Sequence, residues 1–109
     1  MTAPFSLDDL IKLIETRALS PVDRSYTRTL LDAGTPRIAK KFGEESVELV
    51  IAAVGGKKAE IVAEAADVIY HLLVLLQAGG IHLDQVVQEL GRRTQQSGLE
   101  EKASRPPSA

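Results

Sequence analysis

The fold of this chain is decided by the stretch Lys40-Lys41-Phe42-Gly43-Glu44-Glu45-Ser46-Val47-Glu48 and by its counterpart Glu64-Ala65-Ala66-Asp67. Successive residues of an α-helix are about 100° apart, so Glu45 and Glu48 lie within about 60° of each other. Glu44 extends the same acidic arc to about 100°. Glu64 and Asp67 repeat the i, i+3 spacing on a second helix. The sequence therefore predicts two helices, each with an acidic face.

Gly55 and Gly56 separate these two helices. Glycine is a strong helix stop, so the two helices should fold back antiparallel as an αα-hairpin with a short loop. Glu48 lies seven residues before Gly55, and Glu64 lies eight residues after Gly56. At about 1.5 Å per residue, both acidic pairs are roughly 10 to 12 Å from the turn. The spacing predicts that the four carboxylates of the two pairs face one another at the same level.

Carboxylates brought that close repel one another, and the sequence offers no matching cluster of cations at that level. Carboxylate oxygens are hard ligands suited to Mg²⁺ or Mn²⁺, and the chain has no cysteine that would favour a soft metal. The alternative is that the acids, Glu44 and Glu60 included, are merely the solvated faces of two helices. Their helical spacing, their symmetry about the turn and the apolar residues around them favour a metal site.

The acidic motifs Glu44-Glu45-x-x-Glu48 and Glu64-x-x-Asp67, with fifteen residues between them, resemble the signature of the all-α nucleotide pyrophosphohydrolases. Within that superfamily the chain is similar to the phosphoribosyl-ATP pyrophosphohydrolase family of histidine biosynthesis, from about Tyr26 to Arg105. The segment that points to this family in particular is Ser97-Gly98-Leu99-Glu100-Glu101-Lys102-Ala103-Ser104-Arg105.

The resemblance implies hydrolysis of 1-(5-phosphoribosyl)-ATP to 1-(5-phosphoribosyl)-AMP and pyrophosphate, with Mg²⁺, or Mn²⁺, as the cofactor. It implies that the metal ligands are Glu45, Glu48, Glu64 and Asp67, and that these four and Glu44 form the catalytic set. Glu44 would be an additional ligand, a residue that contacts the ligands but not the metal, or the general base that accepts a proton from the attacking water. The phosphorus that is attacked and the number of metal ions stay open.

The same resemblance implies phosphate and hydroxyl contacts away from the carboxylates. Lys41, one turn before the acidic pair, is either a surface ion pair or a contact to a substrate phosphate. His71 is either a satisfied core residue or a substrate contact. From residue 96 to residue 105 the chain is polar enough to be a frayed end, but the resemblance places it near the active site. The candidate substrate-binding residues are Lys41, His71, Arg93, Ser97, Lys102 and Arg105.

Composition indicates one small domain spanning residues 1–109, because 44% of the 109 residues are hydrophobic. The net charge of −2 provides no general attraction to nucleic acid or to an anionic membrane. No signal peptide is recognisable, and the longest apolar run is far shorter than the roughly 20 residues that cross a bilayer. We therefore expect a cytoplasmic protein with a small nucleotide substrate and no nucleic-acid or membrane partner.

Helix start and stop signals predict four or five helices. Ser6 should cap the first helix, and Thr35 with Pro36 should provide the N-cap and first residue of the third. In the last helix, Val86, Val87 and Leu90 should point inward. Residues 106–109 should form a disordered tail. The expected helices span residues 7–18, 25–33, 36–54, 58–78 and 83–95.

The expected fourth helix is apolar nearly all round from Val68 to Leu76, where only Tyr70 and His71 interrupt the apolar surface. A helix that is apolar on all sides must be covered on all sides, and a chain this small has few other helices to do so. We therefore expect an all-α bundle of four or five helices that assembles as a homodimer, with the acidic hairpin at its centre.

Two other functions remain open from the sequence. The first is a housekeeping pyrophosphohydrolase that acts on free or damaged nucleotides. The second is a helical interaction module without enzymatic activity, whose acidic stripe binds a basic partner.

Overall fold

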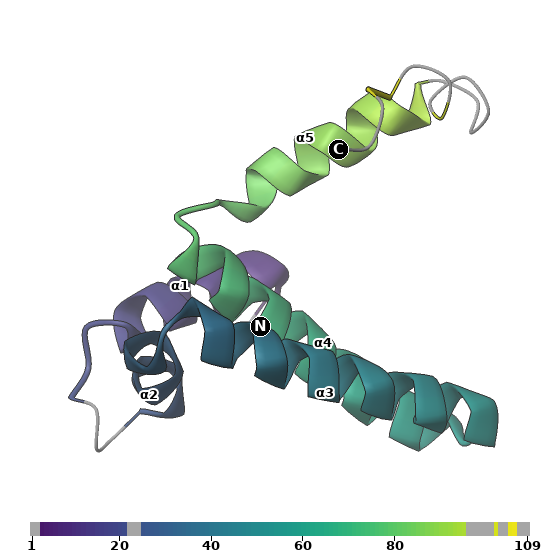
Figure 1. The fold of residues 1–109 in the computed structure, drawn as a ribbon, viewed down its shortest axis with the longest axis horizontal. Helices are drawn as coiled ribbons and strands as arrows, with labels where there is room; N and C mark the ends of the chain where they lie inside the picture. The colour runs from purple at the N-terminus through teal and green to yellow at the C-terminus, as the bar shows by residue number, and fades with distance from the viewer. Residues whose placement is uncertain (1–2, 22–24, 96–101, 103–104, 107–109) are drawn as a thin grey trace.

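The computed structural model describes residues 3–21, 25–95, 102 and 105–106. The described residues form helices and no strand, which confirms the expected all-α class (Figure 1). Each helix begins and ends within about one residue of the expected position. Ser97, which is predicted to bind substrate, lies outside the described residues. So do residues 107–109 of the predicted disordered tail. The helices are α1 Leu7–Arg17, α2 Tyr26–Ala33, α3 Thr35–Gly55, α4 Lys58–Ala78 and α5 Leu83–Thr94.

The start of α1 follows the sequence signal. The Ser6 hydroxyl accepts a hydrogen bond from the Asp9 backbone N–H at 3.1 Å, and the Asp9 carboxylate accepts one from the Ser6 backbone N–H at 3.1 Å. This reciprocal pair satisfies two backbone donors that no helical bond can satisfy. The expected cap at Ser6 is therefore confirmed.

The start of α3 differs by one residue from the expectation. Thr35 is already helical, and the cap position is occupied by Gly34, whose φ of 94° is one that glycine adopts without steric cost. The prediction of Thr35 as N-cap is wrong for that reason. At the other end of α3, Gly56 has a φ of 78° and its backbone N–H donates to the Ala52 carbonyl at 3.1 Å. This left-handed residue ends the helix, as the Gly55-Gly56 pair predicts.

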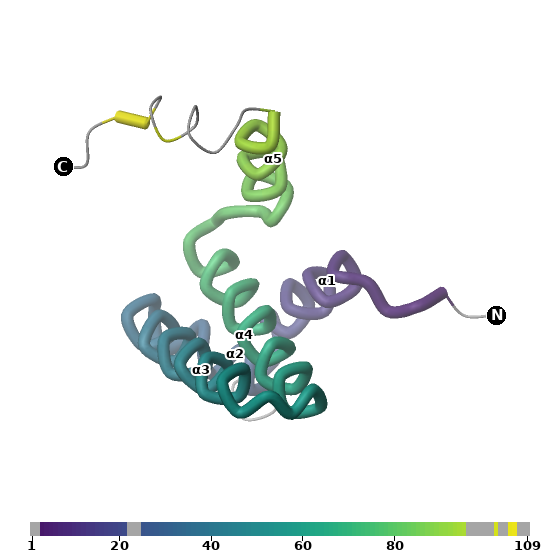
Figure 2. The backbone as a smooth tube through the Cα atoms, turned by 90° about the vertical axis from the view of Figure 1, so that its right-hand side faces the viewer, coloured from purple at the N-terminus to yellow at the C-terminus, as the bar shows by residue number. Residues whose placement is uncertain are grey.

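Helices α3 and α4 lie side by side along most of their length, and among the described helices no other pair is in such extensive contact (Figures 1 and 2). α1 and α2 pack across one end of this hairpin. The core forms there, where residues of four helices meet; its buried members are Ile14, Leu30, Ile38, Leu73 and Val74. The acidic residues of both helices lie farther along the hairpin, between this core and the turn that joins α3 to α4.

Helix α5 stands away from the rest of the chain in both views (Figures 1 and 2). It contains no buried residue, and Val87 and Leu90 are 53% and 55% exposed. The expectation that these side chains point inward is therefore wrong for the single chain, because no other described helix covers them. No helix in the described part of the chain is long and apolar enough to cross a membrane.

Replacing Ile38 by alanine should lower the free energy of unfolding by about 2 to 5 kcal/mol, because Ile38 is 0% exposed and is the buried side chain by which α3 packs into the core. The matched control is Leu19→Ala, since Leu19 is 86% exposed and its replacement should change stability by no more than about 0.5 kcal/mol. Urea denaturation of both variants at one protein concentration measures the difference. Equal stability of the two variants would contradict the packing described here.

Candidate metal and phosphate site

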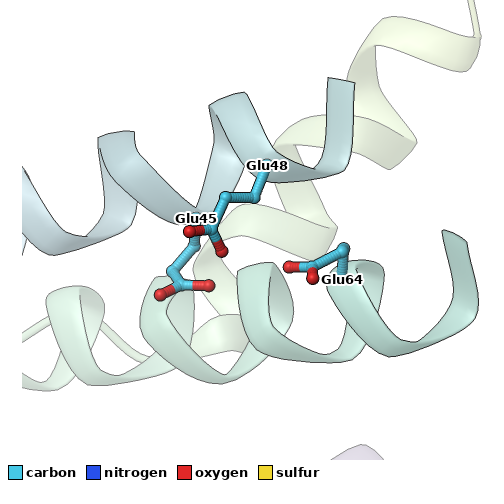
Figure 3. Close-up of side chains that lie close together, drawn as sticks. All are labelled: Glu45, Glu48 and Glu64. Carbon is cyan, nitrogen blue, oxygen red and sulfur yellow. The ribbon is translucent and has the colours of Figure 1, made fainter. Parts of the chain in front are cut away.

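Three carboxylates converge in the middle of the hairpin. Glu45 and Glu48 come from α3 and Glu64 comes from α4, and Figure 3 shows the three side chains pointing toward one another. One oxygen of each carboxylate lies within 4.8 Å of the others. The expectation that the two acidic motifs meet at the same distance from the turn is confirmed for these three residues.

The surroundings of this three-carboxylate cluster make it unfavourable without a cation. Glu45 is only 8% exposed, and the Oε2 atom of Glu64 is buried with no hydrogen-bond partner. The pKa of Glu48 is raised above its ordinary value, chiefly by the negative charge of Glu45 and a hydrogen bond to it, and further by burial and by Glu64. A buried oxygen without a partner and three mutually repelling carboxylates are satisfied together by a divalent cation. The donor set, all carboxylate, fits Mg²⁺ or Mn²⁺.

Asp67, the fourth expected ligand, lies outside this cluster in the structure. Its side chain is exposed, and it is one methylene shorter than that of glutamate, so its carboxylate extends less far across the hairpin. Its backbone carbonyl accepts a hydrogen bond from Nδ1 of His71 at 2.7 Å. The assignment of Asp67 as a metal ligand stays a prediction.

Lys41 lies at the edge of the cluster, one turn before the acidic pair on α3. Its Nζ atom is 3.4 Å from Oε1 of Glu45 and 3.9 Å from Oε2 of Glu44. The hydrogen bond to Glu45 is the main reason why the pKa of Lys41 is raised, so this side chain carries its positive charge at neutral pH. Glu44 itself is outside the cluster and half exposed. Both residues are therefore placed beside the carboxylates that the cation would join.

His71 is buried and bonded within the protein on both sides of its ring. The Asp67 carbonyl can only accept, so Nδ1 carries a hydrogen, and in the neutral ring Nε2 accepts from the Tyr26 hydroxyl at 3.3 Å. The ring also meets that of Tyr70 edge to face, with centroids 5.1 Å apart. The substrate contact expected of His71 stays a prediction, while the contact observed here is the one that orients Tyr26.

Helix α5, which carries Arg93, stands away from α3 and α4 in the single chain (Figures 1 and 2). Arg93 and Arg92 on α5 both bond to Glu89, and these hydrogen bonds lower the pKa of Glu89 to about 2. Lys102, which is helical, and Arg105, which is in a bend, are both exposed. The substrate-binding roles expected of Arg93, Lys102 and Arg105 therefore stay predictions.

A cavity of about 350 Å³ opens next to the cluster, between α2 and the first half of α3. It is a feature that the sequence analysis missed, although Arg37, Lys40, Lys41 and Glu44 recur at intervals of three and four residues, which places them on one side of a helix. The polar residues that line it are Tyr26, Thr29, Arg37, Lys40, Lys41 and Glu44.

Comparison with known proteins identifies the family. A model of the family described as phosphoribosyl-ATP pyrophosphohydrolase matches residues 7–94. The chain is 56% identical over 101 residues to phosphoribosyl-ATP pyrophosphatase 1 of Bradyrhizobium diazoefficiens, covering 93% of this chain and 95% of the relative. It is 55% identical over 107 residues to the phosphoribosyl-ATP pyrophosphatase of Methylobacterium radiotolerans, covering 98% and 99%. A third relative of that name, from Azorhizobium caulinodans, is 54% identical over 100 residues, covering 92% of each chain. The chain therefore belongs to the phosphoribosyl-ATP pyrophosphohydrolase family.

Proposed function

We propose that this protein hydrolyses phosphoribosyl-ATP to phosphoribosyl-AMP and pyrophosphate, as a cytoplasmic enzyme of histidine biosynthesis. Membership of the family and the names of relatives that match nearly the whole chain support this reaction. The observation that carries it in the structure is the cluster of Glu45, Glu48 and Glu64, whose carboxylates meet from two helices. A bound cation would let a triphosphate approach such a cluster and would offset the repulsion among the three carboxylates.

We further propose that Glu45, Glu48, Glu64 and Asp67 hold Mg²⁺ or Mn²⁺. The unpartnered Oε2 atom of Glu64 and the raised pKa of Glu48 support a ligand role for these two residues. When bound, the ion supplies positive charge that offsets the charge of the substrate phosphates. Asp67 joins the set through its place one turn beyond Glu64, where a change of side-chain rotamer directs its carboxylate toward the cluster.

The residues beside the cluster then act on water and phosphate. Glu44 would accept a proton from the attacking water or serve as a further ligand, and its position beside both the cluster and the cavity supports this role. Lys41 holds its charge next to Glu45 and lines the cavity, so it can donate hydrogen bonds to a phosphate oxygen. His71 orients the hydroxyl of Tyr26, which lines the same cavity.

We also propose that the protein is a homodimer with the acidic hairpin at its centre. Val47, Val50, Ile51 and Val54 form a row on α3 that is between 58% and 84% exposed. Val62 on α4 and Leu90 on α5 are exposed as well. A second copy of the chain would cover these faces, and contiguous exposed apolar surface of this kind is typical of protein interfaces.

The purified protein should release pyrophosphate from phosphoribosyl-ATP in the presence of Mg²⁺ and should prefer that substrate to ATP. Chelation of divalent cations with EDTA should abolish turnover, and added Mg²⁺ should restore it, because the carboxylate cluster repels an uncomplexed triphosphate. A coupled assay of pyrophosphate measures both. Strong preference for a free nucleoside triphosphate would instead indicate a housekeeping enzyme, and no release from any nucleotide would indicate a binding module.

Replacing Glu48 by glutamine should raise the melting temperature of the metal-free protein at neutral pH and reduce the further rise that Mg²⁺ produces. The pKa of Glu48 is raised, so its ionised form is disfavoured in the folded state, and its unfavourable effect on stability appears as pH rises through that pKa. Loss of this ligand should weaken Mg²⁺ binding by about tenfold or more. Thermal melts with and without Mg²⁺ test both effects. Glu15→Gln on α1 is the control that removes the same charge elsewhere, and identical behaviour of the two variants would exclude Glu48 as a ligand.

The protein should elute as a dimer at micromolar concentration, and Val50→Asp should convert it to a smaller species. A carboxylate introduced into a buried apolar interface has no partner, which makes association unfavourable. Light scattering after size-exclusion chromatography measures the mass. Leu19→Asp, a charge introduced at an exposed leucine on another surface, should leave the mass unchanged. A folded parent protein that is monomeric under these conditions would contradict the dimer.

A further inference from the structure

The cavity beside the cluster carries three positive side chains and hardly any negative ones. Arg37, Lys40 and Lys41 line it from α3, and Glu44 is the one acidic side chain that lines it among the residues described. Tyr26 and Thr29 of α2 add hydroxyl groups to the opposite wall. A net positive cavity is suited to an anion with several oxygens.

Among the described residues, two of these cations have no acidic partner. Within the described chain, neither Arg37 nor Lys40 has an acidic side chain at ion-pair distance, whereas Lys41 is paired with Glu45. Arg37 also lies in the first turn of α3, where the preceding Gly34 offers no side chain to bond the free backbone N–H groups. Among the residues of that first turn, Arg37 lines the cavity.

The cavity and the carboxylate cluster are adjacent. Lys41 lines the cavity and lies 3.4 Å from Oε1 of Glu45, and Glu44 lines the cavity and lies within one residue of the cluster. One phosphate of a polyphosphate chain could thus lie at the cluster while the neighbouring phosphates of the same chain lie in the cavity. In phosphoribosyl-ATP the β- and γ-phosphates follow the α-phosphate directly, whereas the phosphate of the second ribose is separated from it by the base and two sugars.

We infer that the cavity lined by Arg37, Lys40 and Lys41 binds the β,γ-diphosphate of the substrate, and hence the pyrophosphate product, beside the metal cluster. This inference rests on the proposed reaction and adds two residues, Arg37 and Lys40, to the site. It is independent of which phosphorus the water attacks, because pyrophosphate is the product in either case. The volume of about 350 Å³ is within the range of small-ligand sites.

The test is binding of inorganic pyrophosphate to the full-length protein, measured by isothermal titration calorimetry at saturating Mg²⁺. In the double variant Arg37→Ala/Lys40→Ala the dissociation constant for pyrophosphate should rise about tenfold or more, because two charged hydrogen-bond donors are lost. Both side chains are exposed, so the fold should persist, and a thermal melt of the variant checks this. Mg²⁺ binding should be unchanged, since neither residue is in the carboxylate cluster.

The control is Lys12→Ala/Arg17→Ala, which removes one lysine and one arginine from α1 and should leave pyrophosphate binding unchanged. Titration with ribose 5-phosphate distinguishes the two phosphate sources. Its binding should be the same in the parent and in the Arg37→Ala/Lys40→Ala variant. Equal pyrophosphate binding in the two double variants would overturn the inference, as would a selective loss of ribose 5-phosphate binding.

The outcome is separable from that of the proposed reaction. Pyrophosphate binding is measured without turnover, so it can depend on Arg37 and Lys40 even if the parent protein does not hydrolyse phosphoribosyl-ATP. Conversely, the parent protein could hydrolyse phosphoribosyl-ATP while the Arg37→Ala/Lys40→Ala variant binds pyrophosphate as tightly as the parent. That result would support the proposed reaction and would exclude the cavity as the pyrophosphate site.

Discussion

Repulsion among Glu45, Glu48 and Glu64 is the constraint on which the rest of the structure depends. Like charges held this close favour either protonation or a bound cation, and the raised pKa of Glu48 shows the first tendency. The carboxylates stay together because α3 and α4 are joined by a tight turn and packed along their length. Burial of Ile38, Leu73 and Val74 at one end of the hairpin therefore stabilises an arrangement at its middle that is unfavourable by itself.

Opposite charges are separated over a short distance along one helix. The first half of α3 presents Arg37, Lys40 and Lys41, and the next two turns present the glutamates. A cation and a polyphosphate bound together need such a division, because carboxylates hold the cation and basic groups hold the phosphate oxygens. Lys41 marks the boundary, since it contacts Glu45 and lines the cavity. The hydrogen bond between Tyr26 of α2 and His71 of α4 joins these two helices near Lys41.

The second unfavourable feature of the single chain is its exposed apolar surface, which no other described helix covers. The buried core is small, and three exposed valines and Ile51 follow α3 past the acidic cluster toward the turn. Helix α5 covers none of them and has no buried residue of its own. In a dimer built on the hairpin, the surface that covers these side chains would lie close to the carboxylates. Association and catalysis would then depend on the same pair of helices, which is how a domain of 109 residues can enclose a site.

The sequence by itself determined the helices and the place where their acids meet. Helical spacing, the glycine pair and the distances of Glu48 and Glu64 from the turn are local properties, so the hairpin and three of its four acids could be predicted from them. The one-residue error at Gly34 is also local, because glycine and threonine both serve as caps. The outward position of Val87 and Leu90 could not be predicted, since it depends on where α5 lies relative to the other helices.

Only the tertiary structure decided which side chains surround the acids. The pairing of Tyr26 with His71 joins residues 45 positions apart, and the cavity exists because α2 packs against α3. Spacing along α3 places Arg37 and Lys40 on one side but does not show what faces them. Spacing along α4 likewise places Asp67 near Glu64, whereas in the structure its carboxylate lies outside the cluster. Periodicity specifies the face of a helix, but packing between helices specifies the neighbours of each atom on that face.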